Sequence, residues 1–62
     1  MKVYAYQDQS GTQFITWDEI MEEYYPWWID QMRKVGKEHE ISPEACVEDF
    51  CTTQWATEVF EL

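Results

Sequence analysis

The chain has few basic residues. Four of its 62 residues are Lys or Arg, against thirteen Asp or Glu, so the formal net charge is -9 at pH 7. Nucleic acids and anionic membranes are repelled by such a field, whereas basic protein surfaces are attracted to it. The composition therefore argues against direct binding of nucleic acid or an anionic membrane and favours a basic protein partner.

Long apolar runs are also missing. The N-terminal MKVYAYQDQ lacks the uninterrupted apolar stretch of a signal peptide. No other segment approaches the roughly 20 apolar residues of a membrane span. We expect a soluble protein that acts inside a cell.

Residues that could carry catalysis are scarce. The single histidine, His39, lies in the polar segment KEHE, and no glycine-rich turn presents either of the two thiols. Cys46 and Cys51 fall in a predicted helix, where a step of about 100° per residue directs them roughly 140° apart and away from a local disulfide. We predict two small buried thiols and no enzyme.

No metal or cofactor site is expected either. Asp18 with Glu22, and Glu19 with Glu23, are four residues apart and share a helix face, but no histidine accompanies them and no loop has the alternating oxygen ligands of a calcium site. The simplest interpretation of these pairs is an acidic face in contact with water.

Aromatic residues, by contrast, are abundant: four Trp, four Tyr and three Phe. One buried aromatic removes on the order of 150 to 250 Å² from water, which compensates for the small core that a short chain can form. We predict one small domain over residues 1–62.

Extended segments are predicted at both ends. KVYAYQ, the turn DQSGT and QFI indicate a hairpin over residues 2–15. From Thr52 onward, TTQWATEVF is β-branched and aromatic and predicts a final strand that pairs with the first. The expected fold is α+β, a three-stranded antiparallel sheet with one kinked helix and one short helix on one face.

The longer helix begins at a capping box, TWDE, and ends at Gly36. Its apolar stripe keeps one phase through Pro26, which falls on the polar side, so a kinked helix is favoured over two helices meeting at Tyr25. At about 100° per residue the stripe, with Ile20 at its edge, contains Trp17, Met21, Tyr24, Trp28, Gln31, Met32 and Val35.

The shorter helix opens in ISPEACVEDF, with Ser42 as the N-cap and Pro43 at the first helical position. Its predicted apolar face contains Cys46, Val47 and Phe50. Its predicted outward face contains Glu44, Glu48 and Asp49.

Residues 14–59 resemble a group of short, uncharacterised acidic proteins encoded by tailed bacteriophages. The resemblance is most specific in YYPWWIDQMRKVGK and next in ISPEACVEDF. It implies no particular activity and no functional residue. It implies a setting, a phage protein acting in the cytoplasm of a host bacterium, where small acidic proteins often inhibit or modify host machinery.

Two functions fit these patterns. In the first, the protein docks on and inhibits or modifies a basic host protein, for which a defence protein or a nucleic-acid-binding protein is the candidate. An acidic helix face, which can imitate the charge of a nucleic-acid backbone, steers the encounter, and Tyr25, Trp27 and Ile29 are the apolar anchors. In the second, an aromatic edge makes a homodimer and the charge serves solubility alone. Trp27 is the ring most expected to be exposed. The predicted partner-binding residues are Asp18, Glu19, Glu22, Glu23, Tyr25, Trp27, Ile29 and Asp30.

Overall fold

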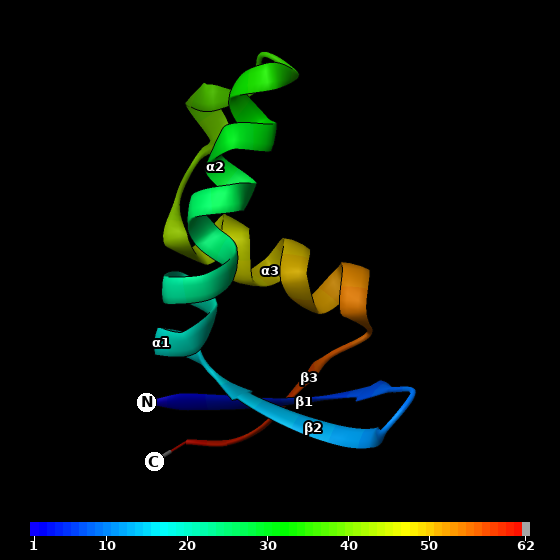
Figure 1. Cartoon of the computed structure of the whole chain (residues 1–62). Helices are drawn as coiled ribbons and strands as arrows, with labels where there is room; N and C mark the ends of the chain where they lie inside the picture. The colour runs from blue at the N-terminus through cyan, green and yellow to red at the C-terminus, as the bar shows by residue number, and fades with distance from the viewer. Residues whose placement is uncertain (62) are drawn as a thin grey trace.

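A computed structural model, which describes residues 1–61, contains a three-stranded antiparallel sheet with the helices on one of its faces (Figure 1). The strands are β1 (Lys2–Asp8), β2 (Gly11–Thr16) and β3 (Thr57–Glu61), in the order β2-β1-β3. The predicted α+β fold is confirmed, including the pairing of the last strand with the first.

The hairpin turn between β1 and β2 is closed by side chain and backbone together. Asp8 Oδ1 accepts a hydrogen bond from the Ser10 amide at 2.7 Å, and Gly11 adopts a φ of 108°, which a residue with a Cβ rarely takes. The resulting register pairs Tyr4 with Ile15 and Val3 with Thr16.

One continuous helical segment follows β2, and it consists of α1 (Trp17–Glu19), the π-helical turn η1 (Ile20–Tyr24) and α2 (Tyr25–Lys34). The Thr16–Glu19 capping box is present, with both amides bonded at 3.1 Å. The helix runs through Pro26, as predicted. The π turn lies just before the proline, where a missing amide would otherwise interrupt the α-helical ladder.

The π turn changes which side chains reach the core. It takes in one extra residue, so the positions after it rotate by about 100° relative to those before it. Ile20, predicted at the edge of the stripe, is fully buried, whereas Val35, predicted within it, is 66% exposed beyond the end of α2. The stripe drawn with uniform steps was therefore right to include Ile20, although only at its edge, and was wrong at Val35.

The chain returns through the 3₁₀ turn η2 (Glu38–Glu40) to α3 (Pro43–Gln54). Ser42 caps α3 as predicted, since its Oγ accepts from the Ala45 amide at 3.1 Å. The predicted strand from Thr52 was placed too early, because α3 continues to Gln54. Thr52 donates its hydroxyl proton to the Glu48 carbonyl at 3.0 Å, so this β-branched residue is accommodated inside the helix.

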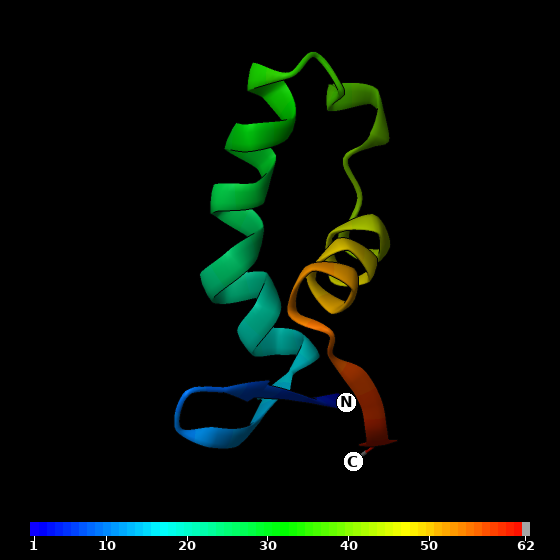
Figure 2. The same ribbon diagram turned by 90° about the vertical axis from the view of Figure 1, so that its right-hand side faces the viewer.

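The core lies where both helices meet the helix-facing side of the sheet. Figure 2 shows the joined helix and α3 side by side above the strands, linked by the turn through η2. The cluster of buried residues consists of Tyr4, Ile20, Trp28, Cys46, Val47, Phe50 and Ala56. Within residues 1–61, every helix is too short or too polar to cross a bilayer.

Candidate protein-binding surface

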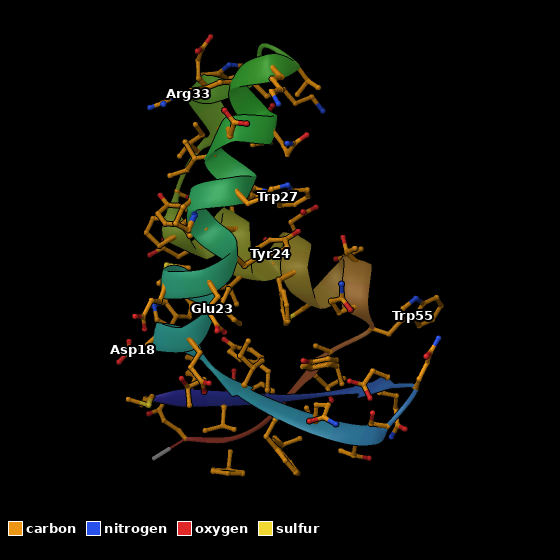
Figure 3. All side chains as sticks on the ribbon, in the orientation of Figure 1. Asp18, Glu23, Tyr24, Trp27, Arg33 and Trp55 are labelled. Atoms are coloured by element: carbon orange, nitrogen blue, oxygen red, sulfur yellow. The ribbon has the colours of Figure 1, made fainter. Side chains whose placement is uncertain are left out.

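Trp27 projects from α2 with 56% of its surface exposed. Glu23 lies four residues before it and Asp30 three residues after it, so the three side chains share one side of the helix. Both carboxylates belong to exposed residues. The result is an accessible indole with an acid about one turn away in each direction, and Figure 3 labels Glu23 and Trp27 on the helix.

The Trp27 ring is backed by an ordered set of contacts. Its centroid lies 5.4 Å from that of Tyr24, and the rings are tilted by 53°. Tyr24 in turn meets Phe50 of α3 edge-on, with centroids 5.3 Å apart. Trp27 is therefore exposed on one side and supported on the other, an arrangement that lowers the entropy lost when a partner binds.

Asp49 of α3 holds the Tyr24 ring, which contacts Trp27, in place. Its Oδ2 accepts one hydrogen bond from the Tyr24 hydroxyl at 3.3 Å and another from Trp28 Nε1 at 3.1 Å. Burial, followed by the neighbouring Asp49 charge, raises the pKa of Tyr24 to about 12, so its hydroxyl stays protonated and able to donate at neutral pH. Asp49 is exposed, as predicted, yet it also links the two helices.

The acidic residues of the joined helix differ in their partners. Glu19 is engaged in the capping box, and Asp30 pairs with Lys34 at 3.1 Å. In the part of the chain that the structure describes, Asp18, Glu22 and Glu23 have neither an ion pair nor a side-chain hydrogen bond. The negative charge is therefore least compensated over the first turns of the helix.

Two of the predicted binding residues lie apart from Trp27. Tyr25 and Ile29 are half-buried and pack against the core, and the Tyr25 ring stacks on Trp28 at 6.1 Å. The rotation imposed by the π turn brings both toward the core and carries Trp27 away from it. The geometry thus groups Glu23, Trp27 and Asp30, which we call the Trp27 surface, and leaves Tyr25 and Ile29 outside that group.

Trp55 is a second exposed ring, which the sequence analysis assigned to a strand. It is 89% exposed and ends α3 in the left-handed conformation, at φ 57° and ψ 36°. Figure 3 shows its side chain pointing away from the rest of the molecule. The sequence has no glycine near the end of α3, where a left-handed residue usually ends a helix, so another residue has to adopt this conformation. A hollow of about 410 Å³ beside it is lined by Cys51, Thr52, Trp55, Ala56 and Thr57.

A groove of about 380 Å³ separates α2 from α3. Its lining includes side chains of both charge signs, Lys37 with Glu40, Glu48 and Asp49, together with the apolar Trp28, Met32 and Ala45. Among residues 1–61 no three potential ligands are grouped closely enough to hold a metal ion.

The thiols are poorly suited to act as nucleophiles. Burial, and next the Asp49 charge, raises the pKa of Cys46 to about 11. Burial also raises the pKa of Cys51, with Glu58 adding to the effect. Both thiols are therefore protonated at neutral pH, whereas the reactive species is the thiolate.

Comparisons with protein-family models, with curated proteins and with solved structures found no match to this chain. The inference about function therefore rests on the chemistry of its surface.

Proposed function

We propose that this protein is a non-catalytic binding protein that docks on a basic surface of another protein through the Trp27 surface and the neighbouring acidic residues of the joined helix. The observation that carries this proposal is an exposed, supported tryptophan with a carboxylate about one turn away on each side. Exposed aromatic rings with a charged rim are common in protein interfaces.

The partner group that this arrangement fits is an arginine or lysine side chain. A cation over an indole face gains about 0.5 to 2 kcal/mol, depending on how far it is desolvated. Glu23, which has no ion pair of its own, lies about one turn from Trp27 and can accept from the same cation, whereas Asp30 is already paired with Lys34. Arginine fits best, because its planar guanidinium can stack on Trp27 while its N–H groups reach a carboxylate.

The uncompensated charge of Asp18, Glu22 and Glu23 contributes mainly to the encounter. Exposed ion pairs contribute at most about 1 kcal/mol each, but a field of one sign raises the association rate with an oppositely charged surface. The expected complex is therefore guided by charge and anchored by Trp27, and it weakens as salt screens the field.

The resemblance to short phage proteins supplies the biological setting. The proposed partner is a host bacterial protein in the host cytoplasm, either a defence protein or one that binds nucleic acid. An acidic surface that covers the basic site of such a protein prevents it from engaging its own ligand. Inhibition or modification by occlusion needs no catalytic step.

Affinity capture from bacterial lysate tests the proposal. The variants are Trp27→Ala and Glu23→Lys, and Glu38→Lys in η2 is the control, because it makes the same charge change at an exposed site away from Trp27. A basic protein retained by the wild type and by Glu38→Lys, but lost from both test variants, supports the proposal. Equal retention by all four proteins contradicts it.

A further inference from the structure

The face of the sheet turned away from the helices has no helix over it (Figure 1). Side chains alternate between the faces of a strand, and directly paired residues point to the same side. Tyr4, Tyr6 and Ile15 pack against the core and so mark the helix side. The register then assigns the opposite side, here called the outer face, to Val3, Ala5, Gln7, Thr12, Phe14, Thr16, Thr57 and Phe60.

The outer face is uncharged. The strands contain four charged residues, and each belongs by register to the helix side: Lys2 pairs with Glu61, Glu58 is opposite Tyr4, and Asp8 is opposite Gly11. The 3.9 Å ion pair between Lys2 and Glu58 agrees with this assignment. A chain with a net charge of -9 thus keeps one face of its sheet free of charge.

The outer face is also apolar at its centre. Phe14 is 62% exposed on β2, and Phe60 is 47% exposed on β3. Val3, between those two strands on β1, is only 4% exposed although no helix covers it. Val59, at the bulge of β3, is 46% exposed beside Phe60. Two of the polar residues of this face satisfy each other, since Gln7 Nε2 donates to Thr12 Oγ1 at 2.9 Å.

We propose that the outer face binds the outer face of a second copy of this chain. Two copies of so acidic a protein repel each other where their carboxylates approach, and the strands place no charged residue on the outer face, so this is the face of the sheet on which two copies can meet without that repulsion. Face to face, two sheets pack about 10 Å apart, and the helices of the two copies point in opposite directions. This arrangement buries Phe14 and Phe60 while keeping the acidic helices far from each other.

The size of the face sets the strength of the association. Three strands about 4.8 Å apart and about 20 Å long give roughly 300 Å² per copy. Stable interfaces bury about 800 Å² per partner, so the dimer is weak and reversible. Both Trp27 surfaces stay accessible in it, and the dimer presents two of them.

Sedimentation velocity on the intact chain, over about 10 μM to 1 mM, tests the proposal. The wild type should shift from monomer to dimer with concentration, and more strongly in high salt, because salt screens the repulsion between copies. High salt should strengthen the dimer but weaken docking on a basic partner. Failure of one proposal is therefore distinguishable from failure of the other.

Phe14→Lys should abolish the concentration dependence, and Gln9→Lys in the hairpin turn is its charge-matched control. Both changes make the chain less negative, so a loss of self-association specific to Phe14→Lys reflects the outer face and not greater repulsion. Thr57→Lys is a second variant on the same face that removes no large side chain. A wild type that stays monomeric at about 1 mM in high salt overturns the proposal, and so does undiminished dimerisation in folded Phe14→Lys or Thr57→Lys.

Discussion

Asp49 and Trp28 connect the two helices. The Asp49 carboxylate accepts the indole Nε1 proton of Trp28 at 3.1 Å, on a tryptophan that is only 5% exposed. The same oxygen accepts the Tyr24 hydroxyl at 3.3 Å, so one carboxylate satisfies two aromatic donors. Because Tyr24 supports Trp27, this connection also positions the proposed binding surface.

Asp49→Ala should lower the free energy of unfolding by about 1 to 2 kcal/mol, because it leaves the buried Trp28 indole without its acceptor. Asp49→Asn, which keeps an oxygen acceptor, should lose less. Glu48→Ala removes a neighbouring acid that accepts no such side-chain donor, and its effect should stay within about 0.5 kcal/mol. Urea unfolding measures all three. Equal losses for Asp49→Ala and Glu48→Ala contradict the assigned role.

Ile20 and Val35 test which apolar residues of this segment belong to the core. Ile20→Ala should cost about 2 to 5 kcal/mol, because it empties a fully buried position. Val35→Ala should cost less than about 0.5 kcal/mol, because Val35 is largely exposed. Urea unfolding measures the difference. A loss for Val35→Ala as large as that for Ile20→Ala contradicts this placement of the two residues.

The π turn shows where prediction from the sequence ends. The capping box at Thr16, the cap at Ser42 and the order of the elements follow from local patterns, and the structure confirms them. The π turn does not follow from such a pattern. The missing amide of Pro26 is visible in the sequence, but the burial of Ile20 in the core shared with the sheet and α3 is tertiary, and no local pattern predicts it.

The rotation of the helix at the π turn also explains which part of the candidate site could be predicted. Trp27 is exposed, as expected, and Glu23 and Asp30 flank it because they share its helix face. Tyr25 and Ile29 were expected beside it, but the rotated helix turns them toward the core. Their predicted role in binding remains a prediction, now for residues that are half-buried.

Trp55 carries a backbone conformation that suits glycine. Trp55→Gly should raise the free energy of unfolding by about 1 kcal/mol relative to Trp55→Ala, because only glycine adopts a φ of 57° without a Cβ clash. Both variants remove a ring that is 89% exposed, so lost packing is the same in each. Thermal or urea unfolding gives the difference. No advantage of Gly over Ala indicates that the left-handed cap is not strained.

Alkaline pH should destabilise the fold through two groups. Folding raises the pKa of Cys46 from 9.0 to about 11 and that of Tyr24 from 10.0 to about 12, in both cases mainly by burial. Each group ionises first in the unfolded chain, so its contribution to stability is complete below the unfolded pKa and is lost as pH rises through the folded value.

Urea unfolding at a series of pH values between 8 and about 12 measures this loss. Cys46→Ala should remove the part of the decline between about pH 9 and 11, and Tyr24→Phe the part between about pH 10 and 12. The quantity compared is the slope of the free energy of unfolding against pH. A substitution that changes the free energy of unfolding by the same amount at every pH leaves this slope unchanged. Slopes identical to that of the wild type contradict the burial of these groups.

The central claim is that Trp27, with its flanking carboxylates, anchors a basic protein. Calorimetric titration of the captured partner tests it most directly. Trp27→Ala should weaken binding by about tenfold or more, Glu23→Lys should weaken it and flatten its salt dependence, and Glu38→Lys should change it by less than about twofold. Wild-type affinity in folded Trp27→Ala would contradict the account.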